Sequence, residues 1–269
     1  MMTKTRQAVP PRSGDASSPQ TTHGYSLRIT PRRVCYALLG ITGTLLIINL
    51  LIIFFRFIVG NEHLRGFIYG FYFDHEANFP SAYSAAAILL SAVLLWKISR
   101  LEREKTGGRV RYWQLLSLVF VFLAADEFMA LHEYLIVPVK SQLENTRLDS
   151  GYLYFGWLVP YIVITLILAM VMLRLLVKLP AWTRNGMLLA AVVFLLGAAG
   201  MEMVGGNYWA GQGWAVDGSD EVDLTYALII TLEELLEMLG IIIFIYVLLR
   251  YYLHERSDIT VHLRLGTDR

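Results

Sequence analysis

The sequence predicts an all-α, polytopic integral membrane protein with six transmembrane helices in one bundle. Of its 269 residues, 56% are hydrophobic. Apolar stretches of about 20 residues recur along the chain, which is the length that a helix needs to cross the hydrocarbon core of a bilayer. Basic residues alternate between the connections, as in multi-pass proteins. Together these observations predict a protein whose main partner is the lipid bilayer.

The six apolar stretches define the predicted domain organisation. They span residues 34–59, 81–98, 112–137, 152–179, 183–206 and 224–251. Residues 1–27 are rich in Ser, Thr, Pro and Gly and lack the apolar core of a signal peptide, so we expect a disordered cytoplasmic tail there. The transmembrane domain is expected to cover residues 28–253, and a short cytoplasmic tail residues 254–269.

The distribution of Lys and Arg predicts the orientation. Of the 23 basic residues, 19 fall on one side of the predicted bundle, which we interpret as the cytoplasmic side. Both termini then lie in the cytoplasm, and the predicted location is the inner (plasma) membrane of a cell. Because the basic residues follow topology and form no binding face, and because the net charge is only +1, we expect no nucleic-acid partner.

Three of the apolar stretches carry acidic residues, and these predict a functional site. A carboxylate at the bilayer centre costs roughly 2.5 to 3.5 kcal/mol, so it is retained when it faces a cavity, a cation or another polar group. No Lys or Arg lies near the acidic residues in those segments to pair with them. The side chains in question are Asp126, Glu127, His132, Glu133, Glu202, Glu233, Glu234 and Glu237.

Helical spacing places these side chains together in the outer half of the bilayer. Asp126 and Glu133 are seven positions apart, so on one continuous helix they share a face. Glu233 and Glu237 are one turn apart, and Glu202 lies among glycines that allow helices to approach closely. The predicted metal ligands are Asp126, His132, Glu133, Glu202, Glu233 and Glu237.

Oxygen-rich ligands with one imidazole favour a divalent cation, namely Mn, Fe, Zn, Mg or Ca, and this ligand set is large enough for a di-metal site. The candidate catalytic residues are Glu127, Glu234 and Glu76. Glu76 belongs to an outer loop, residues 74–81, in which we also expect a functional role for Asn78, while Ser81 or Ser84 is expected to cap the next helix. Trp and Tyr residues at the span ends, such as Trp157, are interpreted as interfacial anchors.

Four motifs resemble those of an uncharacterised group of bacterial six-helix membrane proteins. They begin at Glu76 (E-x-N-x-P-S), Asp126 (D-E-x4-H-E), Gly200 (G-x-E) and Glu233 (E-E-x2-E-M). The resemblance supports the fold and the choice of residues and implies no activity. The segment 232–236 is also similar to the paired-glutamate motif of membrane lycopene cyclases, which implies acid catalysis on an isoprenoid.

Several functions are compatible with such a site. We expect a metal-dependent enzyme that acts on a lipophilic small molecule and is either a hydrolase or an oxidoreductase. The alternatives are a cation or proton-coupled transporter, an accessory subunit or assembly factor of a membrane complex, and an acid-catalysed isoprenoid-modifying enzyme. Protonated acids that only hold helices together are a fifth interpretation. A homodimer is compatible with all of them.

Overall fold

The computed structural model describes residues 26–27, 30–60, 65–75, 77–105, 108–143, 151–214, 222–256 and 261–262. Its contacts divide the chain into two units. One comprises residues 1–28 and 260–269, and the other, which we call the helical unit, comprises residues 29–259. In the first unit β1 (Ser26–Leu27) pairs with β2 (Val261–His262) in antiparallel fashion. The predicted tails, residues 1–27 and 254–269, otherwise lie almost entirely outside the described residues.

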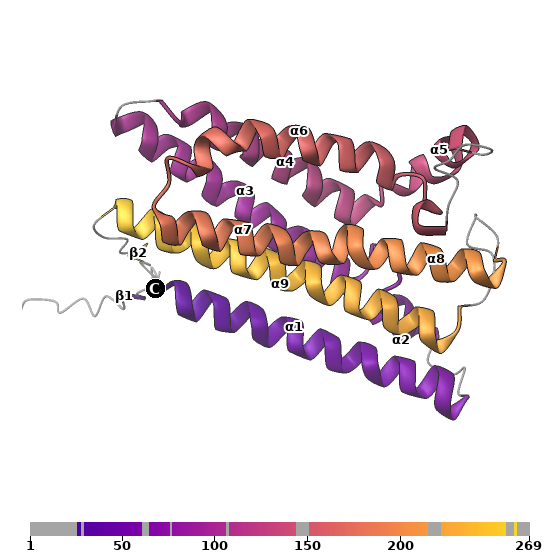
Figure 1. Cartoon of the computed structure of the whole chain (residues 1–269). Helices are drawn as coiled ribbons and strands as arrows, with labels where there is room; N and C mark the ends of the chain where they lie inside the picture. Colours follow the sequence, from indigo (N-terminus) through magenta and orange to yellow (C-terminus); the bar gives the residue numbers. More distant parts are fainter. Residues whose placement is uncertain are drawn as a thin grey trace, which may run out of the picture. The chain divides into compact units, whose positions relative to one another are not determined.

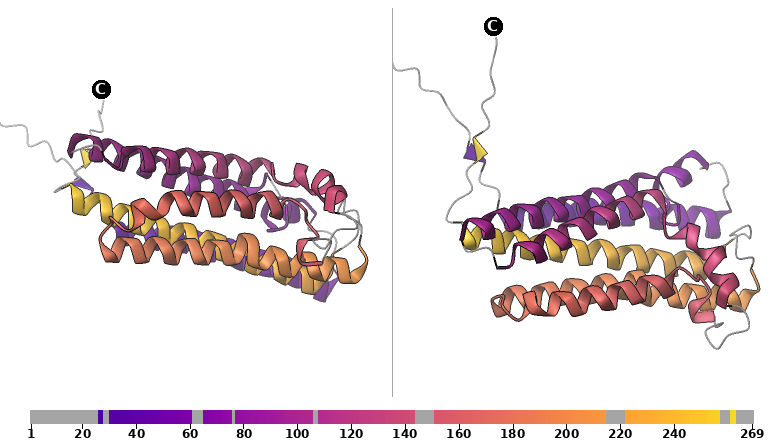
Figure 2. Two further views of the ribbon diagram at one scale, coloured as in Figure 1. Left: turned by 45° about the horizontal axis from the view of Figure 1, so that its top comes forward. Right: turned by 90° about the horizontal axis from the view of Figure 1, so that it is seen from above.

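The helical unit consists of long helices and short irregular turns (Figure 1). Its elements in chain order are α1 (Pro31–Ile53), the π-helical η1 (Phe54–Val59), α2 (Arg65–Phe71), α3 (Phe79–Lys105), α4 (Val110–Met129), the 3-10 turn η3 (Glu133–Leu135), α5 (Ile136–Leu143), the 3-10 turn η4 (Gly151–Leu153), α6 (Leu158–Leu176), α7 (Ala181–Leu195), the π-helical η5 (Leu196–Met201), α8 (Glu202–Gln212) and α9 (Leu224–Glu255). The elements α2, α5 and α8 lie at one end of the unit, which we call the α5 end (Figures 1 and 2).

Five of the described helices are long and apolar enough to cross a membrane. They span Pro31–Val59, Phe79–Glu104, Val110–Met129, Leu158–Leu176 and Ala181–Gln212. These helices indicate a multi-pass membrane protein. The sixth predicted span corresponds to α9, which is not among the five. It is 32 residues long and buries much of its C-terminal half, including Ile245 and Leu248.

Helix α9 lies between α1 and α7 and also contacts α3 (Figure 1). Glycines allow α7, η5 and α9 to approach closely. A Cβ atom added at Gly186 would lie 2.6 Å from a Val247 methyl group, and one added at Gly240 would lie 2.7 Å from the Phe194 nitrogen. Without a hydrophobic driving force between helices in lipid, such small-residue contacts favour their association.

Asn78 caps the N-terminus of α3. Its side-chain oxygen accepts the Ser81 N–H at 3.0 Å, and the Ser81 hydroxyl accepts the Asn78 N–H at 2.9 Å. The Asn78 amide also donates to the Tyr72 carbonyl at 2.7 Å. This reciprocal arrangement satisfies backbone groups that a helix start leaves open. Ser81 therefore takes part in the cap as predicted, with Asn78 as the N-cap residue, whereas Ser84 does not, and the functional role expected for Asn78 stays a prediction.

The third predicted span ends earlier than its apolar pattern indicated. We expected one helix over residues 112–137, but α4 ends at Met129 and Ala130 adopts a left-handed conformation with φ 48°. The Asp126 carboxylate accepts the His132 N–H at 2.8 Å, which stabilises this reversal. Asp126 and Glu133 therefore do not share a helical face, because Glu133 begins the separate turn η3.

Candidate functional site

Asp126 organises one part of the site near the α5 end. Besides the His132 N–H, one of its oxygens lies 3.4 Å from the His132 Nδ1 atom. The Tyr161 hydroxyl of α6 donates to the other oxygen at 3.1 Å. Both carboxylate oxygens are thus engaged, as a buried carboxylate requires. Asp126 thereby connects α4, the turn that follows it, and α6.

Trp157 connects Asp126 and His132 to Glu202. Its indole N–H donates to a Glu202 carboxylate oxygen at 2.8 Å, and its ring lies 4.7 Å from that of His132. Trp157 is only 8% exposed. The interpretation of Trp157 as an interfacial anchor was therefore wrong, because its side chain is buried and its indole N–H donates to the carboxylate of Glu202.

Glu202 faces Glu233 of α9, and the two carboxyl groups approach closely enough to share a hydrogen bond. One Glu233 oxygen is buried without a hydrogen bond of ordinary geometry to any described residue. Residues 185–249 contain no Lys or Arg, and neither do residues 112–139. We call Asp126, His132, Trp157, Tyr161, Glu202 and Glu233 the acid cluster.

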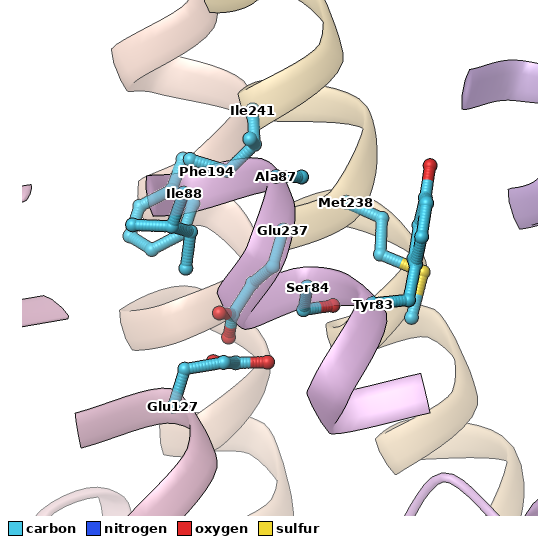
Figure 3. A pocket seen from close by; sticks show the side chains of 9 residues that line it. All are labelled: Tyr83, Ser84, Ala87, Ile88, Glu127, Phe194, Glu237, Met238 and Ile241. Atoms are coloured by element: carbon cyan, nitrogen blue, oxygen red, sulfur yellow. The ribbon is translucent and has the colours of Figure 1, made fainter. Parts of the chain in front are cut away.

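Glu127 and Glu237 meet elsewhere, in a small cavity between α3, α4, α7 and α9. Their carboxyl groups point toward one another, with Ser84 beside them (Figure 3). The remaining walls are mostly apolar and include Phe194 and Met238. The volume of the cavity, ≈ 10 Å³, is about that needed for one water molecule.

Gly197 leaves room for α9 to lie close to η5 at Glu233 and Glu237. A Cβ atom at this position of η5 would lie 2.8 Å from the Glu237 Cγ atom and 2.7 Å from the Glu233 carbonyl oxygen. The π-helical turn that contains Gly197 leads directly into Glu202 at the start of α8. A single irregular segment thus contacts both acidic positions, and such π-helical turns are frequent at functional sites.

The other predicted residues lie around these two groups. Glu133 is exposed on η3, Glu234 is partly buried on α9, and Glu76 lies outside the described residues. Asp74 lies near the acid cluster, in the segment between α2 and α3. Burial raises the pKa of its carboxyl group to about 7, Arg56 opposes this shift, and the negative charges of Glu133 and Glu202 add to it.

The six predicted metal ligands do not converge on one point. Among the residues that the structure describes, no three His, Cys, Asp or Glu side chains are arranged so that they could hold a metal ion together. The acidic residues instead form two pairs, Glu202 with Glu233 and Glu127 with Glu237, and Asp126 engages hydrogen-bond donors of its own.

Comparison with known proteins identifies a family. The family model described as "Domain of unknown function (DUF8692)" matches residues 38–252, which include every described residue of the acid cluster and the cavity. The chain belongs to this family. No curated protein and no solved structure matches it.

Three contributors to the site in this DUF8692 domain were not identified from the sequence. Trp157 and Tyr161 donate hydrogen bonds to acids that are 45 and 35 positions away, respectively. No local pattern distinguishes such donors from aromatic residues at a span end. Gly197 is the third, and its only signal was its place among the small residues that precede Glu202.

Proposed function

We propose that this DUF8692 protein is a membrane enzyme in which the Glu202–Glu233 pair performs general acid–base chemistry on a lipophilic substrate. The observation that carries the proposal is the close approach of these two carboxyl groups, with no Lys or Arg in the chain segments 112–139 and 185–249 around them. Two carboxyl groups at hydrogen-bond distance in a low dielectric share one proton, because both cannot be ionised. One of them is then an acid while the other is a base.

The surroundings of the pair support unequal roles for the two residues. The Trp157 N–H donates to Glu202, which favours the ionised form of Glu202. Glu233 has a buried oxygen without a hydrogen bond of ordinary geometry, and it lies on α9 beside Glu237 and Glu234. We therefore assign the proton to Glu233, as the acid, and the role of base to Glu202.

Access is proposed from the α5 end. The His132 side chain is 24% exposed there while its ring contacts Trp157, so it lies between the surface and Glu202. Toward the other end of the unit, Leu95, Leu175, Ile245 and Leu248 form a closed apolar core. In the proposed topology α9 is the sixth span, both termini are cytoplasmic, and the α5 end faces the outside of the inner (plasma) membrane.

The shared proton is tested by infrared spectroscopy on the purified full chain. Wild type should show a carboxylic-acid carbonyl band at neutral pH, and Glu233→Gln should lose the part of this band that the pair contributes. The exposed Glu104 on α3 provides the matched control, because Glu104→Gln removes a carboxylate without altering the pair. An unchanged acid band in both Glu233→Gln and Glu202→Gln would exclude the shared proton.

The enzymatic role is tested by lipid analysis. Membranes from cells that express wild type, Glu202→Gln or Glu104→Gln are compared by mass spectrometry. We expect a lipid species that changes in abundance with wild type and with Glu104→Gln, and does not change with Glu202→Gln. Identical lipid profiles for all three proteins would contradict the enzyme proposal.

A proton-coupled transporter is the second candidate, and one observation favours it. The π-helical η5 interrupts one long apolar helix, η1 ends another, and η5 lies against the acidic residues of α9. Irregular backbone at membrane depth is typical of transport sites when it lines a cavity. Proteoliposomes that acidify in response to a gradient only with wild type, and not with Glu202→Gln, would favour this candidate over the enzyme.

A further inference from the structure

We propose that the cavity between Glu127 and Glu237 is a separate binding site for one divalent cation, with the Ser84 hydroxyl as a further ligand. The site differs from the Glu202–Glu233 pair in its residues, and its cation binding is independent of the proposed enzymatic function. It also differs from the six-residue metal site that the sequence predicted.

The first argument is geometric. Glu127 extends from α4 and Glu237 from α9, and their carboxyl groups face each other across the cavity (Figure 3). The volume of ≈ 10 Å³ accommodates about one water molecule, and a single cation with ligands from its walls needs no more. The Tyr83 hydroxyl points away from the carboxyl groups in Figure 3 and bonds to Leu38 and Thr42 instead.

The second argument is the Ser84 hydroxyl. Ser84 is 6% exposed and its hydroxyl is directed at the Glu127 carboxyl group, and it has no second partner among the described residues. Serines in the same helix behave differently, since Ser91 donates to the Ala87 carbonyl at 3.2 Å and Ser99 to the Trp96 carbonyl at 2.7 Å. A hydroxyl group can donate one hydrogen bond and accept two, so a buried hydroxyl that reaches only Glu127 keeps lone pairs for a cation in the cavity.

The third argument is charge. Glu127 and Glu237 carry two negative charges when ionised, and none of the other residues that line the cavity is basic. A divalent cation neutralises both charges, whereas a neutral water molecule leaves them in an apolar enclosure. Two carboxylates and a hydroxyl are hard oxygen ligands, and they supply fewer oxygens than Ca²⁺ usually takes. The ligand set therefore favours a smaller divalent cation that needs few water ligands, and Mn²⁺ is a suitable probe.

The test measures Mn²⁺ binding to the full chain, purified in detergent and stripped of metal with a chelator. Free Mn²⁺ is followed by electron paramagnetic resonance during a titration at pH 8. Wild type should bind one Mn²⁺, while Glu127→Gln and Glu237→Gln should bind it at least about 100-fold more weakly. Ser84→Ala should weaken binding about tenfold or more. Glu202→Gln is the matched control and should bind as wild type does.

Three results would overturn the proposal. They are an absence of saturable Mn²⁺ binding by folded wild type, undiminished affinity in both glutamine variants, and loss of binding in Glu202→Gln together with its retention in Glu237→Gln. The first would leave the cavity to a water molecule. If the glutamine variants do not fold, Ser84→Cys in a Cys35→Ser background serves instead. A thiolate ligand should shift the preference from Mn²⁺ to Cd²⁺, and an unchanged preference would exclude Ser84 as a ligand.

Discussion

The acid cluster and the cavity contain the same kind of side chain in opposite surroundings. In the acid cluster, donors such as Trp157 and Tyr161 reach the carboxylates of Glu202 and Asp126. In the cavity, Glu127 and Glu237 face mostly apolar walls and the hydroxyl group of Ser84. We propose that donors and a shared proton stabilise the first group, and that a bound cation stabilises the second.

Asp126 and Glu127 illustrate how neighbouring residues enter these different environments. Successive residues of an α-helix point about 100° apart, so the two side chains of α4 leave it in different directions. Asp126 turns toward Tyr161 of α6, and Glu127 turns toward α3 and α9. One helix therefore supplies an acid to each site, and variants at the two positions should have separable effects.

The largest effect is expected where one residue contacts both sites. Gly197→Ala places a methyl group 2.7 Å from the Glu233 carbonyl oxygen and 2.8 Å from the Glu237 Cγ atom, so η5 and α9 have to move apart. Overpacking of this kind costs about 3 kcal/mol. We expect a clearly lower melting temperature in detergent, and loss of both the shared proton and Mn²⁺ binding.

Gly200 in the same π-helical segment is the matched control for that experiment. The atoms nearest to a Cβ at Gly200 are 3.8 Å away, which is ordinary contact. Gly200→Ala should therefore be neutral or slightly stabilising, because alanine favours helical backbone. Equal melting temperatures for Gly197→Ala and Gly200→Ala would show that close approach at Gly197 does not hold the two sites together.

A smaller effect, confined to the acid cluster, is expected for Trp157→Phe. Phenylalanine keeps most of the ring contact with His132 but removes the donor to Glu202, which leaves a partly buried carboxylate with one donor fewer. The cost should be roughly 2 kcal/mol. Trp96→Phe is the control, because Trp96 is 48% exposed. Mn²⁺ affinity at the cavity should not change, and a parallel loss there would mean that the two sites are one.

The sequence predicted the membrane helices because a continuous apolar run in lipid satisfies its backbone hydrogen bonds by forming a helix. The bounds of α1 with η1 and of α7 with η5 and α8 follow the predicted stretches within a few residues at most ends. The end of α4 was missed, since neither Gly nor Pro marks residues 129–133 and the reversal depends on Asp126 as an acceptor. The Asn78 cap did have a local signal, Asn followed by Pro80 and Ser81, which the expectation of a functional loop obscured.

The acidic residues of the site could be identified from their cost in lipid, but their partners could not. The apolar surroundings show that the carboxyl groups of Glu202 and Glu237 need a polar or charged partner. They do not show whether this partner is an indole, a second carboxyl group or a cation. Which acids pair depends on helix rotation and on close contacts such as that at Gly197, where η5 meets α9. These are properties of packing between segments distant in sequence.

The smallest expected effect concerns Asp74, near the acid cluster. Because burial, together with Glu133 and Glu202, raises the pKa of Asp74 to about 7 against the opposing charge of Arg56, the folded protein keeps this proton to a higher pH than the unfolded chain does. The stabilising contribution of the proton is complete below the ordinary pKa of an aspartate, and it is lost as the pH rises through about 7.

Asp74→Asn should remove this pH dependence, because asparagine resembles the protonated acid at every pH. We expect the melting temperature of wild type to fall by a few degrees more than that of the variant between pH 5 and pH 8.5. Glu133→Gln is the companion variant. It removes one of the charges that raise the pKa of Asp74, so the fall should be smaller and should end at a lower pH. Parallel curves for wild type and Asp74→Asn would mean that Asp74 is already ionised at neutral pH and that the acid cluster exerts no measurable field on it.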